Sequence, residues 1–246
     1  MPSALRERLK RIQVLRSAFR SWQWGLTRVR RLVGLALRPA LVSRYLARHP
    51  EPRLQLGAGA IRMPGWLNTD GFPVSLSIVS VDAGDPLPFP DGTFAHVFSE
   101  HHIEHMPYLS GRSMLRECHR VLRPRGRIRI ATPDLDTLLR LHSSPRSAKQ
   151  EEYIRWITDT WMPELKGTYS DVLVINNAFR AWGHQCVYDE ATLRASLVEA
   201  GFVDVKRYPP GESDDPHLKG LESHGNAVGN VELNRFETMV LEGRKA

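Results

Sequence analysis

From Arg53 onward, short apolar runs alternate with helical stretches, and this alternation limits the possible folds more than any other feature of the chain. A doubly wound parallel sheet requires that order, because a parallel strand is followed by a crossover before the next one. Strands are expected at 53–57, 66–70, 77–82, 95–99, 127–132, 203–208 and 236–242. Helices are expected at 110–122, 134–142 and 190–200, with Asp134 as an N-cap and Gly201 as a left-handed C-cap. The sequence therefore predicts one α/β domain.

Residues 1–50 differ from the rest in charge. They carry twelve Arg and Lys side chains against one acid, a net charge of +11, which leaves −4 for residues 51–246. Apolar residues recur there at three- and four-residue steps, which is typical of an amphipathic helix, and Pro39 is expected to break it. These positions are Leu5, Leu9, Ile12, Leu15, Phe19, Trp22, Leu26, Val29 and Val33. We therefore divide the chain into a basic helical arm, 1–50, and a domain, 51–246, with an irregular insertion at 143–187 and a long loop at 209–234.

The arm has the composition of an interfacial membrane helix, with arginines between Trp, Phe and Leu. Basic side chains near an anionic leaflet contribute up to about 1 kcal/mol each. Docking on a protein partner or on a second copy of the chain is the competing interpretation, and a homo-oligomer fits it. RNA binding ranks third, because charge alone supports it. The chain has two cysteines without metal-ligand spacing and no long apolar run, which favours a cytoplasmic protein. The basic arm could also attach it peripherally to the inner face of the membrane. An organelle transit peptide shares this composition.

Polar or flexible groups follow each of the first three predicted strands. The run "LQLGAG" leads into a glycine turn at 57–59, "PGWLNTD" ends at Asp70, and the third strand ends at Asp82. Glycine lets a ligand approach the backbone closely, and carboxylates can accept bonds from ribose hydroxyls or an adenine amino group. Ligands of open α/β sheets bind at the carboxyl ends of the strands. These groups predict a nucleoside site at one edge of the sheet.

Four segments together resemble consecutive motifs of class I S-adenosylmethionine-dependent methyltransferases. They are "LQLGAGAIRMPGWLNTDGF", "DAGDPLPFPDGTFAHVFSEHHIEHM", "LRECHRVLRPRGRIRIATPDL" and "GHQCVYDEATLRASLVEAGF". They are most similar to methyltransferase type 11 relatives encoded in bacterial surface-polysaccharide clusters. The resemblance covers about residues 53–245 and implies a seven-stranded, mostly parallel sheet with a reversed last hairpin. The first crossover is shorter than in most such enzymes, so its helix is expected to be truncated, and Ala95 stands where relatives often carry Asp.

The resemblance also implies the cofactor, S-adenosylmethionine, and the residues that hold it. Gly57, Ala58 and Gly59 would face its methionine part, Asp70 its ribose, and Asp82 with Ala83 its adenine. Ser99, Glu100 and His101 would line the pocket after the fourth strand.

The histidines allow two interpretations. Residues 101, 104 and 105 spell H-x-x-E-H, a zinc-binding string, but they follow a strand directly instead of lying on a helix, so we expect no metal. An imidazole that titrates near neutrality suits removal of a proton from a hydroxyl acceptor. His184 is the first candidate for this base, followed by His105 and His102, with His224 a distant fourth; for each, a structural hydrogen-bonded histidine is the alternative.

The expected activity is methyl transfer, with a hydroxyl of a sugar or glycolipid intermediate as acceptor. Trp156, Trp161, Trp182 and Tyr188 could stack on a sugar or line an acceptor cavity, although packing of the insertion against the sheet is the favoured explanation. The alternatives are methylation of oxygen or nitrogen on a small or lipid-like molecule, and a cofactor-binding scaffold without turnover.

Overall fold

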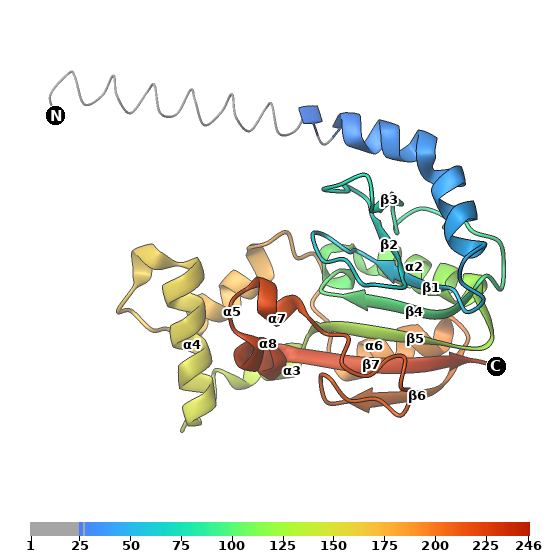
Figure 1. The fold of residues 1–246 in the computed structure, drawn as a ribbon. Helices are drawn as coiled ribbons and strands as arrows, with labels where there is room; N and C mark the ends of the chain where they lie inside the picture. The colour runs from blue at the N-terminus through green and yellow to red at the C-terminus, as the bar shows by residue number, and fades with distance from the viewer. Residues whose placement is uncertain (1–24, 27) are drawn as a thin grey trace, which may run out of the picture.

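The computed structural model describes residues 25, 26 and 28–246 (Figure 1). The predicted apolar positions of the arm from Leu5 to Trp22 lie outside this range. Among the described residues, no helix combines the length and the hydropathy that a membrane-crossing segment needs.

The seven predicted strands all form, and they make one sheet in the order β3-β2-β1-β4-β5-β7-β6. Their bounds are β1 (Arg53–Leu56), β2 (Leu67–Asp70), β3 (Val79–Ser80), β4 (Phe94–Glu100), β5 (Leu122–Pro133), β6 (Phe202–Tyr208) and β7 (Thr238–Lys245). The first five run parallel, and β7 is antiparallel to both of its neighbours. This confirms the doubly wound, mostly parallel α/β sheet with a reversed last hairpin.

The central strands are apolar because both faces of the sheet are covered. In β4, Phe94 and Val97 are fully buried and join the main core, whereas Phe98 packs on the other face with Trp66 and Leu218. Burial of one such side chain contributes about 1.5–3 kcal/mol. Two helices, α2 (Tyr108–Val121) and α6 (Glu190–Glu199), cover the main core behind the sheet in Figure 1.

Two links in the first half of the sheet contain no helix. Turns and bends alone connect β1 to β2 and β2 to β3, which confirms the predicted truncation of the first crossover. The helix of residues 28–46 packs here instead, with apolar side chains of residues 41–46 against the main core. The Tyr45 hydroxyl accepts from the Arg53 N–H and lies within hydrogen-bonding distance of the carbonyls of Arg53 and Gly65, which fixes the end of this helix. The last turns of the predicted arm therefore pack on the domain.

This helix continues through Pro39, where we expected a break. Its ribbon bends between its first turns and β1 (Figure 1), as a proline inside a helix tends to cause. The predicted break at Pro39 is therefore wrong.

Further helices lie beyond the carboxyl ends of the parallel strands (Figure 1). They are η1 (Ile103–His105), α3 (Leu135–Arg140), α4 (Ala148–Trp161), η2 (Pro163–Leu165), α5 (Asp171–Arg180), α7 (His224–Ala227) and α8 (Val231–Glu237). A second buried cluster, which includes Tyr153, Ile154, Ile157 and Leu233, holds α4 and α8 together. We call this part the helical lobe.

The helical lobe corrects two predictions. The stretch 143–187 is mostly helical and not irregular, and the expected loop at 209–234 contains α7 and the start of α8. Ser147 and Gln150 form a capping box at the start of α4, so the helix has a strong local signal. Phe236 and Glu237 end α8 instead of starting the last strand. The caps expected at Asp134 and Gly201 are present: Asp134 accepts from the Asp136 N–H, and Gly201 has a φ of +101°.

Candidate active site

The ends of β1, β2 and β3 meet at one edge of the sheet, as the parallel order requires. Asp70 connects them: one carboxylate oxygen accepts from the Gly59 N–H at 2.8 Å and the other from the Phe72 N–H at 2.7 Å. The Ala58 N–H donates to the Thr69 carbonyl at 2.9 Å. Each carboxylate oxygen keeps further acceptor capacity, so Asp70 can still bind ribose hydroxyls.

Asp82 lies farther along this edge and contacts the N-terminal helix. Its carboxylate accepts from the Gly84 N–H at 3.1 Å and lies 3.5 Å from the Arg31 guanidinium. The Arg31 side chain also lies over the Phe72 ring, 5.1 Å from its centroid. Ala83, the next residue, is buried in the main core. The basic arm therefore reaches the predicted adenine position.

Gly57 has no room for a side chain. Its φ is +69°, and a Cβ placed on it would come within 2.4 Å of Cγ in the His102 ring. Gly59, by contrast, would meet nothing within 4 Å. The lack of a side chain at Gly57 therefore makes room for the His102 ring. The space beside Gly59 is open, so a ligand can approach the turn there.

Two polar atoms beside this turn have unmet hydrogen-bonding capacity. Ser99 Oγ and His102 Nε2 are buried, and neither has a partner among the described residues. Such an atom costs roughly 1–3 kcal/mol, so a ligand that supplies polar groups here would stabilise the fold. Burial lowers the pKa of His102, and the charges of Glu104 and Asp70 oppose that shift. These residues fit a cofactor with polar groups; their role in holding it stays a prediction.

Glu100 and His101 make other contacts than those expected. The Glu100 carboxylate accepts from the backbone N–H groups of Ser223 and His224 at 3.0–3.1 Å and so anchors that loop. The His101 ring stacks on His224, with centroids 4.2 Å apart. His101 has a φ of +44°, in the left-handed region. The two neighbouring side chains contact different parts of the fold: His101 packs on His224, and His102 lies beside Gly57. The expectation that Ser99, Glu100 and His101 line the cofactor pocket stays a prediction.

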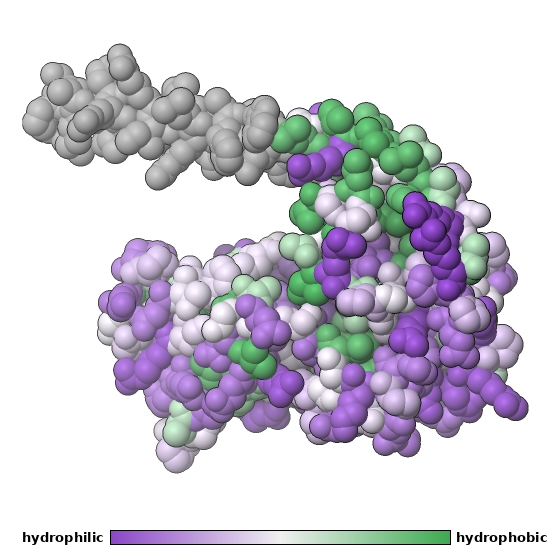
Figure 2. Space-filling model, in the orientation of Figure 1, coloured by the Kyte–Doolittle hydropathy of each residue, from purple (hydrophilic) through white to green (hydrophobic). Residues whose placement is uncertain are grey.

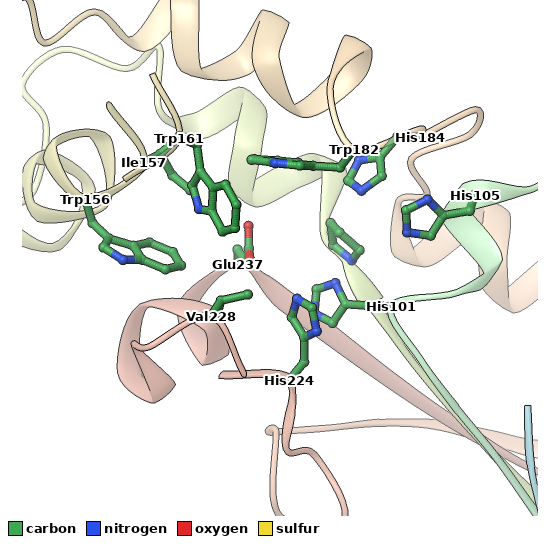
Figure 3. A pocket seen from close by; sticks show the side chains of 11 residues that line it. His101, His105, Trp156, Ile157, Trp161, Trp182, His184, His224, Val228 and Glu237 are labelled. Atoms are coloured by element: carbon green, nitrogen blue, oxygen red, sulfur yellow. The ribbon is translucent and has the colours of Figure 1, made fainter. Parts of the chain in front are cut away.

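A cavity of about 200 Å³ lies where the ends of β4 and β5 meet the helical lobe (Figure 3). It is lined by His101, His105, Pro133, Trp156, Ile157, Trp161, Trp182, His184, His224, Val228 and Glu237. We call it the histidine cavity. Two of the three predicted bases, His105 and His184, are brought together here, with ring centroids 4.9 Å apart. The third, His102, lies at the glycine turn instead, and Tyr188 is buried in the main core.

Backbone hydrogen bonds fix the two histidines in place. The N–H groups of Gln185 and Cys186 donate to the Glu104 carbonyl at 2.7 and 3.1 Å, which joins the segment after Gly183 to η1. His184 Nδ1 lies 2.7 Å from the Ala178 carbonyl, so Nδ1 carries the proton and Nε2 keeps a free lone pair. Burial lowers the pKa of His184 below its ordinary value, although the Glu104 charge opposes this.

The aromatic wall of the cavity is built from α4 and the turn after α5. Trp161 and Trp182 meet edge to face at 5.6 Å, and Trp182 lies 5.6 Å from His184 (Figure 3). Trp182 has a φ of +57°, an uncommon conformation for a bulky residue and one that clusters at functional sites. Both indoles remain about 40% exposed, at 41% and 39%, so their faces are accessible to a ligand.

The sequence did not predict the two buried carboxylates of this region. Glu104 is fully buried; burial alone would raise the pKa of its carboxyl group, but the hydrogen bond and charge of His101, 3.2 Å away, lower that pKa to about 2. Glu237 accepts from Tyr153 and Asn234, and burial raises its pKa. The string H-x-x-E-H contained Glu104, but no local pattern marks Glu237.

Comparison with known proteins gives a domain match and several distant structures. Residues 26–130 match the family model of the methyltransferase domain. No curated protein matches the chain. Among solved structures, a SAM-dependent methyltransferase from Archaeoglobus fulgidus is 18% identical, with a TM-score of 0.46 over 88% of this chain and 94% of the other. A putative methyltransferase of Haloferax volcanii, solved with a methyltransferase activator, is 17% identical, with a TM-score of 0.43 over 86% and 92%. At these identities and scores, the likenesses say nothing of the acceptor or partners.

The matched segment contains the glycine turn, Asp70, Asp82 and His105 of η1. The sheet order beyond it agrees with the fold that the sequence motifs imply. The chain is therefore a methyltransferase, and S-adenosylmethionine is its cofactor.

Proposed function

We propose that this methyltransferase acts on a hydroxyl group of a sugar or of a glycolipid intermediate. The observation that carries the proposal is the histidine cavity, in which imidazoles and indoles line the same small space. At about 200 Å³ it is smaller than the roughly 300–1,000 Å³ of typical drug-sized ligand sites. One ring of an acceptor fits such a space better than an extended molecule.

The aromatic wall supports a sugar as that ring. The indoles of Trp161 and Trp182 expose apolar faces, and an apolar ring face is what the C–H side of a sugar offers. Glu237, His101 and His224 provide polar groups on another side of the cavity, where hydroxyls could be bonded. The cavity therefore has one wall for stacking and one for hydrogen bonding.

His184 is proposed to take the proton of the reacting hydroxyl. The bound cofactor supplies a methyl group on a sulfonium, which is already a good leaving group. The protein must then orient the acceptor and accept its proton. Nε2 of His184 carries the free lone pair, and the Ala178 carbonyl holds the ring in the tautomer that a base needs.

Product formation tests this function. Full-length protein is incubated with S-adenosylmethionine and, separately, with sugars, glycolipids, phenols and amines, and S-adenosylhomocysteine is measured. Product with a sugar or glycolipid supports the proposal. Product only with amines or other small molecules overturns the acceptor class, and cofactor binding without product from any acceptor indicates a scaffold.

The His184→Ala variant should lose about 100-fold or more in turnover, because general bases typically contribute 10²–10⁴-fold. Its affinity for the cofactor should change little, since His184 lies in the histidine cavity and not at the glycine turn. Steady-state kinetics and cofactor titration measure the two effects separately. His142→Ala, at a histidine whose side chain is 73% exposed, is the control and should retain full turnover. Full turnover by His184→Ala would exclude it as the base.

We also propose that the N-terminal helix attaches the protein to an anionic membrane surface. Val29 and Leu32 are 57% and 67% exposed, and Phe72 on the adjoining loop is 52% exposed. Apolar residues dominate the surface of this helix beside the grey segment in Figure 2. Arg28 and Arg30 are exposed on the same helix. An apolar face flanked by arginines supports binding at the boundary of headgroups and acyl chains.

Flotation with liposomes tests this attachment. Wild-type protein should float with vesicles that contain anionic lipid and much less with neutral vesicles. Leu32→Asp should reduce flotation, because it places a charge in the apolar face. Leu139→Asp is the matched control, since Leu139 is an exposed leucine too, at 52%, but lies on α3 and not on the N-terminal helix. Equal flotation by the two variants, or none by the wild type, would contradict the proposal.

A further inference from the structure

We propose that Glu104, His105 and His184 form a binding site for a divalent transition-metal ion such as Zn²⁺. Each of the three side chains offers one ligand atom, and these atoms lie within 4.8 Å of one another. Two imidazoles and a carboxylate are ligands that zinc, cobalt and nickel accept. This departs from the sequence-based expectation of no metal, because His184 lies 79 residues from His105 and completes the set through the fold.

The ligand groups are held before any ion binds. The hydrogen bonds from Gln185 and Cys186 to the Glu104 carbonyl fix the distance between the segments that carry His184 and His105. Tetrahedral ligands at about 2.0–2.2 Å from an ion lie roughly 3.4 Å apart. Small side-chain rotations would therefore bring the three groups to bonding distance, and both imidazoles are only partly buried, which leaves them room to rotate.

Outer hydrogen bonds orient two of the three groups, His184 and Glu104, as metal ligands require. His184 Nδ1 donates to the Ala178 carbonyl at 2.7 Å, so Nε2 is the atom available to the ion. The Thr132 hydroxyl donates to one oxygen of Glu104 at 3.0 Å, and His101 lies 3.2 Å from the other. Metal-binding histidines and carboxylates usually have such outer partners, which fix the tautomer and the direction of the lone pair.

Three protein ligands leave one position of a tetrahedral ion open. His105 and His184 both line the histidine cavity, so the open position would face the place proposed for the acceptor (Figure 3). This consequence rests on the proposed function: an ion on Nε2 of His184 uses the lone pair that would accept the proton. Bound Zn²⁺ should therefore inhibit methyl transfer, and a chelator should restore it.

Titration of the tag-free, chelator-treated full-length chain with Co²⁺ tests the site without any acceptor. We expect one ion per chain and the visible absorption of four-coordinate cobalt. His105→Ala and His184→Ala should remove that absorption, and Glu104→Gln should weaken binding by about tenfold or more, as loss of metal-supporting groups does. His142→Ala should bind like the wild type.

The outcomes separate this proposal from the proposed acceptor. Stoichiometric cobalt binding that depends on His105 and His184 supports the site, whichever acceptor is methylated. No stoichiometric binding by the wild type, or equal binding by the His105→Ala and His142→Ala variants, overturns it, even if sugars are methylated. The two alanine variants replace partly buried side chains, so they test the site should Glu104→Gln fail to fold.

Discussion

Replacing Arg129 by alanine should lower the free energy of unfolding by about 3–5 kcal/mol, because it leaves two buried carboxylates without their cation. Arg129 is fully buried in β5 and forms ion pairs with Glu222 and Glu242, whose side chains are 4% and 3% exposed. It also donates to the Glu212 carbonyl at 2.9 Å. Urea unfolding followed by circular dichroism measures the change.

Two controls show whether burial causes this effect. Arg244 pairs with Asp204 on the surface, where the side chains are 34% and 60% exposed, so Arg244→Ala should cost only about 0–1 kcal/mol. A triple variant with Met at 129 and Leu at 222 and 242 should recover most of the lost stability, since apolar groups can replace a buried ion pair. Equal losses for the Arg129 and Arg244 variants would contradict the argument.

The Arg129 ion pairs also support the histidine cavity. Glu222 immediately precedes the backbone at Ser223 and His224, which Glu100 anchors from β4. We therefore expect Arg129→Ala to disturb the position of His224 as well as the stability of the sheet.

The sheet was predictable because its signal is local. Each buried strand is a short apolar run with a turn residue after it, and the parallel order places the ends of β1, β2 and β3 at one edge. Asp70 and the glycine turn could therefore be assigned to the same site before any coordinates. The predicted cap at Asp134 depended on side-chain chemistry within three residues and is also present.

The helical lobe was missed although α4 has local signals. Ser147 with Gln150 is a capping box, and Tyr153, Ile154 and Ile157 follow at helical spacing. The longest helix of the lobe, α4, has 14 residues, and helices of this length owe most of their stability to tertiary packing, which here is the second buried cluster.

The meeting of His105 with His184 could not be read from the sequence. The two residues are far apart in the chain, and the contact depends on backbone hydrogen bonds between Gln185, Cys186 and Glu104. No periodicity encodes such bonds. The same is true of Gly57, whose role depends on where the His102 ring lies.

The Asp70→Ala variant should raise the dissociation constant for S-adenosylmethionine by about 100-fold or more. Hydrogen bonds to a charged group contribute about 1.5–3 kcal/mol each, and 1.4 kcal/mol corresponds to tenfold in affinity. A ribose that donates both hydroxyls to Asp70 would lose two of them. The carboxylate also accepts from the N–H groups of Gly59 and Phe72, so alanine removes the group that holds the turn and the next loop together. Isothermal titration with cofactor and with S-adenosylhomocysteine measures the loss.

Asp70→Asn separates the carboxylate's charge from its shape, because the amide keeps one acceptor oxygen; its affinity should fall between those of the wild type and Asp70→Ala. Asp91→Ala is the matched control, since this 79% exposed carboxylate precedes β4 at the opposite edge of the sheet and pairs only with Arg120 among the described residues. Its cofactor affinity should equal that of the wild type. If Asp70→Ala also binds the cofactor like the wild type, the ribose must lie elsewhere, and the edge formed by Gly59, Asp70 and Asp82 would no longer be the cofactor site.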